Sequence, residues 1–187
     1  MQKDTGRRKK IERINVFDRA EHILKALQRG ILLNTQADKF NSMVISWGHL
    51  GAIWGKPTFT VYVREHRYTK AQLDKAREFT LSIPLEKPDS EINRVCGFES
   101  ARNVDKAEKA GLTLVPAQRI ATPAVLQYPM TLECGVLYSQ KQDLSLLPEE
   151  IRQSCYPEEV EGDAPFANRD AHTAYIAEIK DAYIIKE

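Results

Sequence analysis

The sequence is poor in the residues that build disulfide frameworks and metal centres. Of its 187 residues, three are cysteines and four are histidines. Cys96, Cys134 and Cys155 are odd in number, widely spaced and without a CxxC pair. We therefore expect reduced thiols, as in a cytoplasmic protein, rather than disulfide bonds. The histidines show no HExxH spacing, so the sequence predicts no metal site.

Several other signatures are absent. No apolar run approaches the roughly 18–20 residues that a membrane helix needs. The chain has no GxGxxG of a dinucleotide-binding fold, no GxxxxGKS/T of a P-loop and no GxSxG elbow. The formal net charge of +1 gives no overall attraction to nucleic acid or to a membrane surface. We therefore expect no nucleic acid and no membrane as partners.

The chain divides into a short tail, one domain and an insertion. The N-terminus is basic without an apolar segment behind it, which predicts a flexible basic tail over residues 1–15 and no signal peptide. Residues 16–187 have the length of a single domain. Within it, residues 141–171 predict an insertion loop with a helical turn at 148–154 and an acidic stretch at 157–163. A connection this long is typical of a lid, a partner contact or a flexible loop.

The apolar pattern predicts a fold that is mainly β with short helices. Residues 58–64, TFTVYVR, alternate apolar and polar side chains, as a half-buried strand does. A helix over 17–29 ends well at Gly30, and another begins with Thr69 as its N-cap. Further strands are expected at 31–35, 42–48, 79–84, 112–115, 124–126, 130–140 and 172–187. Strands interrupted irregularly by helices favour a closed or nearly closed barrel over a doubly wound sheet.

Both tryptophans fall in residues 41–57, among three glycines. A flat aromatic side chain beside glycines and small polar groups suits a planar ligand with a polar tail. The same composition is found in a glycine-rich turn between two strands whose tryptophans belong to a core or an interface. The residues by themselves leave both interpretations open.

Two expected helix starts carry groups suited to phosphate. Arg64 and Arg67 precede the first, where unpaired backbone N–H groups and arginine forks favour a phosphate. Ser100 and Lys106 stand in the same relation to the next helix. The alternatives are a solvated basic turn at the first and ordinary capping by Asn103 at the second.

Three sequence blocks, in this order and spacing, resemble the flavin reductase-like family and most closely its flavoredoxin-type branch. The blocks are NSMVISWG (41–48), VYVREHRYT (61–69) and CGFESARNVDK (96–106), the last followed by AGLT (110–113). With the adjoining strands, the resemblance covers residues 20–140, and the final strand also fits. It implies an FMN-binding split β-barrel.

The resemblance also implies a function. FMN would be bound noncovalently at a homodimer interface, and electrons would pass from NADH or NADPH through it to a flavin or another acceptor. One alternative is a flavoredoxin-like electron-transfer protein without nicotinamide turnover, whose electron donor or acceptor is another protein. A third is a split barrel that binds another ligand, such as haem, or acts only as an interaction module. Because the flavin supplies the hydride chemistry, no catalytic side chain is assigned.

Carried over by position, the resemblance implies three groups of cofactor-binding residues. They are Asn41, Ser42, Met43, Val44, Ile45, Ser46 and Trp47 along the ring and ribityl chain; Arg64, Arg67, Thr69 and Lys106 at the phosphate and ribityl oxygens, with Ser100 nearby; and His172 and Tyr175 of the partner subunit. Ala101 stands where family members commonly have glycine, so we expect it to crowd the ligand. Residues 48–57 are expected to form a structural turn.

Overall fold

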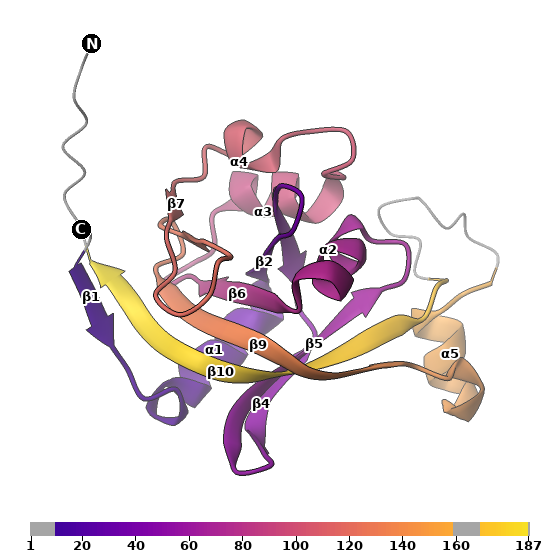
Figure 1. The fold of residues 1–187 in the computed structure, drawn as a ribbon. Helices are drawn as coiled ribbons and strands as arrows, with labels where there is room; N and C mark the ends of the chain where they lie inside the picture. The colour runs from indigo at the N-terminus through magenta and orange to yellow at the C-terminus, as the bar shows by residue number, and fades with distance from the viewer. Residues whose placement is uncertain (1–9, 159–168, 187) are drawn as a thin grey trace.

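The computed structural model describes residues 10–158 and 169–186, in which strands dominate and short helices connect them (Figure 1). The strands are β1 (Lys10–Arg13), β2 (Ile31–Gln36), β3 (Phe40–Ile45), β4 (Gly48–Ile53), β5 (Lys56–Arg64), β6 (Glu78–Ile83), β7 (Leu114–Val115), β8 (Ala124–Val125), β9 (Met130–Lys141) and β10 (His172–Lys186). The helices are α1 (Ala20–Arg29), α2 (Tyr68–Ala76), α3 (Ser90–Phe98), α4 (Lys106–Lys109) and α5 (Glu149–Cys155), with 3-10 turns η1 (Phe17–Arg19) and η2 (Leu144–Leu146). None of these helices is long and apolar enough to cross a membrane.

The main sheet is a split barrel. Its described strands pair antiparallel in the order β3-β2-β6-β9-β10-β5-β4, and β1 adds to β10. The two ends of this path, β3 and β4, follow each other in the chain and are joined only by Ser46 and Trp47. No ladder joins β3 to β4 among the described residues, so the sheet does not close and Trp47 lies at the split.

The core lies inside the curled sheet. Phe59, Val61 and Val63 alternate along β5 and are fully buried, as their spacing predicts. Ile23 and Leu27 of α1 join the same cluster, and α1 packs against β4 and β6. Each such side chain contributes about 1.5–3 kcal/mol on burial. The helices α2, α3 and α4 lie together over the β2–β3 end of the sheet (Figure 1).

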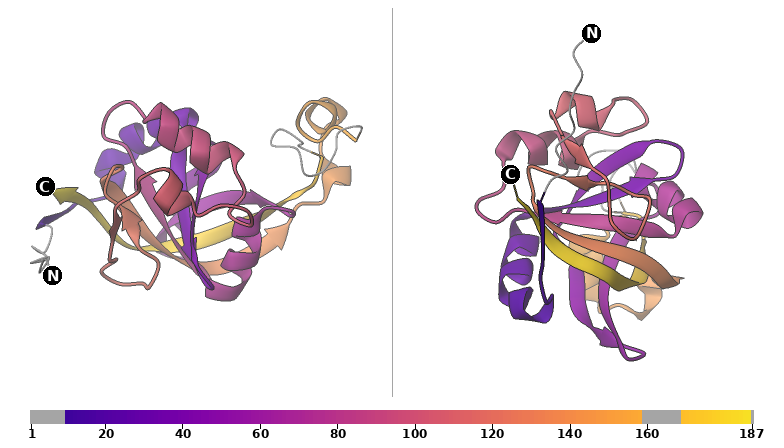
Figure 2. Two further views of the ribbon diagram at one scale, coloured as in Figure 1. Left: turned by 90° about the horizontal axis from the view of Figure 1, so that it is seen from above. Right: turned by 60° about the vertical axis from the view of Figure 1, so that its left-hand side comes forward.

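The long ribbon of β9 and β10 carries α5 at one end and β1 at the other (Figures 1 and 2). The expected tail over residues 1–15 is therefore wrong for residues 10–13, which form β1. Ile11 pairs with Ile185, and the Arg13 guanidinium donates to the Asp181 carboxylate at 3.2 Å. Residues 1–9 lie outside the described part of the chain.

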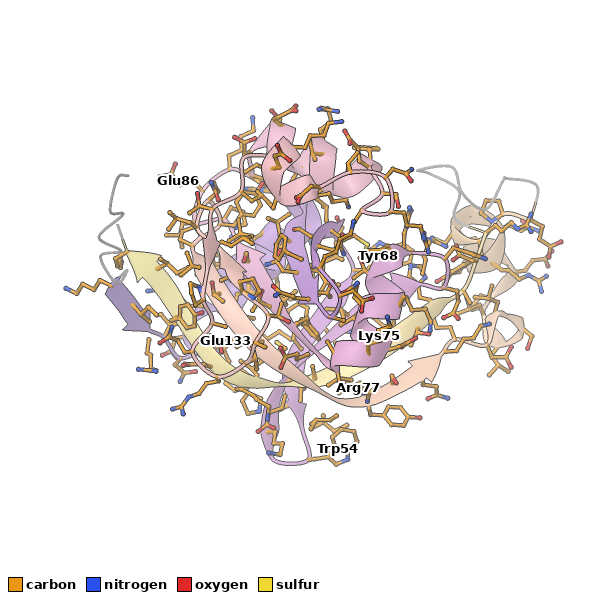
Figure 3. The ribbon with its side chains drawn as sticks, turned by 45° about the horizontal axis from the view of Figure 1, so that its top comes forward. Trp54, Tyr68, Lys75, Arg77, Glu86 and Glu133 are labelled. Atoms are coloured by element: carbon orange, nitrogen blue, oxygen red, sulfur yellow. The ribbon has the colours of Figure 1, made fainter. Side chains whose placement is uncertain are left out.

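The expected turn over residues 48–57 is also wrong, because Gly48–Ile53 form strand β4, paired with β5. The turn is confined to Trp54 and Gly55, with φ of 55° and 69°. Trp54 lies at the tip of this hairpin, away from α2 (Figure 3). A Cβ at Gly48 would come within 2.7 Å of Cε1 of Phe59. Glycine at this position therefore serves close strand packing.

A buried carboxylate organises the loop between β7 and β8. Glu133 of β9, which Figure 3 labels, is fully buried. Its oxygens accept hydrogen bonds from the backbone N–H of Gln118 at 2.6 Å and of Arg119 at 2.7 Å, and from the Tyr183 hydroxyl at 2.7 Å. Three donors compensate for the loss of water around the charge, so Glu133 anchors the loop to the sheet.

Candidate functional site

The loop after β5, the start of α2, the end of α3 and the start of α4 surround a cleft of about 370 Å³, which we call the cationic cleft. Arg67, Arg102 and Lys106 line it, together with the amide of Asn41 and the carboxylate of Asp170. Thr69 and Ser100 also line it, so this cleft brings together residues from all three sequence blocks.

The start of α2 differs from the expectation. The helix begins at Tyr68 with Arg67 in the N-cap position, so Thr69 lies in the first turn and is not the cap. The Thr69 hydroxyl instead accepts a hydrogen bond from the Asn41 amide at 2.9 Å and contacts the sulfur of Met43 at 3.5 Å. Thr69 therefore joins α2 to β3, and the first backbone N–H groups of α2 lie beside the cleft.

Lys106 is a buried cation at the cleft wall. Its side-chain nitrogen donates to the carbonyl oxygens of Ser42 and Cys96, both at 2.9 Å. Burial lowers the pKa of Lys106 to about 8, despite these two bonds. An ammonium group has three N–H donors, so one remains for a ligand in the cleft that Lys106 lines.

The cleft wall also presents an acceptor without a donor. The Oδ1 atom of Asn41 is buried and has no hydrogen-bond partner among the described residues, whereas its Nδ2 is bonded to Thr35 and Thr69. A buried polar atom without a partner costs about 1–3 kcal/mol. A ligand hydroxyl in this cleft would remove that cost.

A second hollow, the aromatic cleft of about 240 Å³, adjoins the first. It is lined by residues 43–47 together with Tyr62, Arg64, Arg67 and His172. The two clefts share Met43 and Arg67, so they adjoin each other at these two side chains. The Trp47 ring lies 5.0 Å from the His172 ring and is tilted by 39°.

Hydrogen bonding determines the tautomer of His172. The Gln142 side-chain oxygen accepts from the backbone N–H of His172 at 3.3 Å and from the Tyr156 hydroxyl at 3.0 Å. Because the Tyr156 proton is used there, Nδ1 of His172, 3.0 Å from the Tyr156 oxygen, must carry the proton of that contact. Burial, and then the charge of Arg64, lower the pKa of His172 to about 3. The neutral ring thus leaves Nε2 as an acceptor.

Arg64 does not line the cationic cleft, where the sequence interpretation placed it. It lines the aromatic cleft, and its guanidinium donates to the carbonyl oxygens of Asp170 at 2.7 Å and Cys155 at 3.3 Å. It also lies 5.2 Å from the centre of the Tyr156 ring. Arg64 therefore fastens both described ends of the insertion to β5. The acidic stretch 157–163 lies mostly outside the described residues.

The prediction for Tyr175 is wrong. Its ring is fully buried in the main core, and its hydroxyl donates to Asp74 at 2.6 Å, so the side chain is not available to a ligand. Ala101 lines the cationic cleft and is buried, at the position where crowding was expected. The sequence interpretation missed Tyr62 and Asp170, although Tyr62 lies inside a recognised block, and it did not carry Arg102 over as a cofactor-binding residue.

Comparison with known proteins identifies the family of this chain. The family model described as flavin reductase like domain matches residues 24–187. A search of curated proteins by sequence found none that matches.

Three solved structures show the same fold. Flavoredoxin of Desulfovibrio vulgaris (Miyazaki F) is 23% identical over 83% of this chain and 68% of its own, with a TM-score of 0.61. A putative flavin reductase with a split-barrel domain from Shewanella frigidimarina NCIMB 400 is 15% identical over 91% and 75%, with a TM-score of 0.62. The 2-nitrobenzoate 2-nitroreductase of Pseudomonas fluorescens is 16% identical over 88% and 71%, with a TM-score of 0.59. Because the family model spans most of the chain, this protein belongs to the flavin reductase-like family.

Proposed function

We propose that this protein is an oxidoreductase that binds FMN and passes electrons from NADH or NADPH to a flavin or another acceptor. The observation that carries the proposal is that the cationic and aromatic clefts adjoin each other at Met43 and Arg67. Two adjoining clefts, one suited to phosphate and one aromatic, match a ligand that has a phosphate and a flat ring.

The residues of the cationic cleft fit the polar part of FMN. Arg67, Arg102 and Lys106 are suited to the phosphate, since charged donors make the strongest hydrogen bonds to it. The unpartnered Oδ1 of Asn41 suits a ribityl hydroxyl, which can donate to it. The cleft thus supplies both the positive charge and the acceptor that the phosphate and sugar-alcohol chain require.

The aromatic cleft fits a ring. Residues 43–47 supply one wall, and Trp47 and His172 supply aromatic surface. The carbonyl of Ser42 points away from β2, toward Lys106. Because backbone groups alternate along a strand, the polar groups of Val44 are directed to the same free edge and can bond to a ring's polar rim.

Bound FMN would supply the hydride chemistry, and the protein would bind and orient it. The neutral state of His172 places no positive charge on that side chain at the cleft wall, while Arg64 and Arg67 supply positive charge beside it. Such charge favours an anionic form of a bound ring.

The test uses the protein as isolated and after addition of FMN. We expect a yellow chromophore with flavin absorption and oxidation of NADH or NADPH once FMN is present. Bound FMN without nicotinamide oxidation would assign the protein to the flavoredoxin-like alternative, which receives electrons from another protein. A colourless protein that binds no added FMN would reject both.

We also propose a homodimer in the cytoplasm. Large apolar side chains are exposed on the β4–β5 hairpin and on the segment before α1, including Trp54 at 59%, Phe17 at 49% and Ile53 at 39% exposure. Exposed apolar surface of this kind favours association. Sedimentation velocity would give twice the monomer mass of 21.3 kDa, and a monomer at micromolar concentration would contradict the proposal.

A further inference from the structure

A third hollow lies beyond Trp47 and extends past the residues proposed for the flavin site. This pocket of about 510 Å³ is formed by α1, the β3–β4 link and β5, with walls that include Leu24, Leu27, Trp47, His49 and Tyr62. We call it the apolar pocket. It shares Ser46, Trp47 and Tyr62 with the aromatic cleft, so the indole of Trp47 belongs to both hollows.

The lining of the apolar pocket contains no acidic side chain, no lysine and no arginine. None of its lining residues is an aspartate, glutamate, lysine or arginine, whereas the cationic cleft contains five such residues. Its polar groups are amides, one hydroxyl of serine, the Tyr62 phenol and the His49 ring, and the last two are 3.3 Å apart. An ionised ligand would lose water here without gaining a counter-ion.

The pocket also offers flat, uncovered apolar surface. Leu24 and Trp47 remain 42% and 44% exposed, although both line a hollow of a size that typically holds a small molecule. Aromatic rings gain more than their area alone when they meet another ring edge or face. A flat ring compound would cover Trp47 and Leu24 together.

We propose that the apolar pocket is a second binding site, for an uncharged planar compound of one or two rings. Its role as the site of an electron acceptor rests on the proposed function, since the acceptor would share the Trp47 wall with the flavin site. Binding itself does not depend on that function. A nicotinamide dinucleotide does not suit this pocket, because no cation lines it to meet a pyrophosphate.

The test uses the fluorescence of Trp47. The chain has two tryptophans, so a Trp54→Phe variant reports on Trp47 alone. Para-nitrobenzamide, an uncharged ring that quenches indole, should give saturable quenching with and without FMN. Para-nitrobenzoate, which differs by one negative charge, should bind about tenfold more weakly or worse, equivalent to about 1.4 kcal/mol.

A variant with a larger side chain in the apolar pocket tests whether the probe binds there. Leu24→Tyr, made in the Trp54→Phe background, enlarges an exposed side chain in the pocket and should weaken para-nitrobenzamide binding about tenfold. Leu146→Tyr is the control, because Leu146 is 81% exposed and lines no part of the pocket. The proposal would be overturned by equal affinity in both variants, by equal affinity for both probes or by the absence of saturable quenching. The absence of saturable quenching is expected if a second copy of the chain covers the pocket. Failure of FMN to bind while para-nitrobenzamide still binds would reject the proposed function and leave this site standing.

Discussion

The side-chain nitrogen of Lys106 lies 2.9 Å from the carbonyl oxygen of Ser42, so a buried charge on α4 is bonded to the free edge of β3. This contact places Lys106 in two roles at once. It fixes the distance between α4 and β3, and it brings a positive charge to the cationic cleft.

Removing a positive side chain from the cationic cleft should weaken the binding of FMN much more than that of riboflavin. Arg67→Met should weaken FMN binding about 10–150-fold, since a charge-assisted contact contributes about 1.5–3 kcal/mol. Riboflavin lacks the phosphate and should lose little affinity. Lys106→Met should show the same selectivity, which fluorescence titration with each ligand measures.

The two variants should differ in stability. Lys106→Met leaves two carbonyl oxygens without their donor, so its unfolding temperature should fall, whereas Arg67 is only half-buried and its replacement should change the temperature less. Equal losses of riboflavin and FMN affinity in Arg67→Met would contradict the phosphate assignment.

FMN affinity should depend on pH through Lys106. Its pKa is lowered to about 8 by burial, and a bound phosphate would raise it, because an opposite charge favours the ammonium form. Above pH 8, binding must therefore take up a proton, and the dissociation constant of FMN should rise up to about tenfold per pH unit. The dissociation constant of riboflavin should stay nearly level. A flat FMN profile between pH 7 and 9.5 would show that Lys106 does not meet the phosphate.

His172 should remain neutral in the folded protein. Nitrogen NMR of labelled histidine should show the Nδ1–H tautomer unchanged from pH 8 down to pH 5, because the pKa of His172 is lowered from 6.5 to about 3. Between those values the unfolded chain holds a proton that the folded chain does not. Stability should therefore decline as pH falls from about 6.5 toward about 3. Titration of His172 near pH 6.5 would show that burial does not lower its pKa, and an Nε2–H tautomer would refute the bonding pattern with Tyr156 and Gln142.

Arg64→Lys should loosen the insertion without removing the charge. A lysine cannot reproduce the planar fork that reaches the carbonyl oxygens of Cys155 and Asp170 together. Hydrogen exchange of the amides of residues 152–156 should be faster in this variant. Exchange in β6 is the internal reference, and a uniform increase across both segments would indicate global destabilisation instead.

Glu133→Gln should destabilise the whole domain. The neutral amide turns one acceptor into a donor that faces a donor, and the fold loses bonds to a charged group of about 1.5–3 kcal/mol each. We expect a loss of about 3 kcal/mol in urea unfolding, with a smaller loss in Tyr183→Phe, which removes only one of the three donors. Equal stability of Glu133→Gln and the parent protein would show that the charge is not needed.

The elements that were predictable from the sequence are those with a strong local signal. The alternation of β5 and of β9 identified both strands, and Gly30, with φ of 97°, ends α1 as expected. Strands β1 and β4 were missed because their sequences, KIER and GHLGAI, have little local preference. Pairing decides their structure. β1 pairs with the distant β10, which leaves no local trace, and β4 pairs with the adjacent β5 across the two-residue turn at Trp54 and Gly55.

The site was predictable only as far as its sequence blocks reach. Asn41, Arg67 and Lys106 were identified and do meet in the cationic cleft. Arg64 and Tyr175 were assigned to the site in the same way. The side of strand β10 on which Tyr175 lies places it in the core, and the insertion engages Arg64. Asp170 was missed because an isolated acidic residue in a long loop gives no signal of the arginine that it meets.

The link of Ser46 and Trp47 sets a covalent limit on the mouth of the barrel. Three peptide steps separate Ile45 from Gly48, so their Cα atoms can be at most about 11 Å apart, at about 3.8 Å per step. Whatever the motion of the surrounding helices, the two-residue link keeps these ends of β3 and β4 within that distance. A ligand held between these two strand ends must therefore fit within that span, so the link limits the width of the split at Trp47.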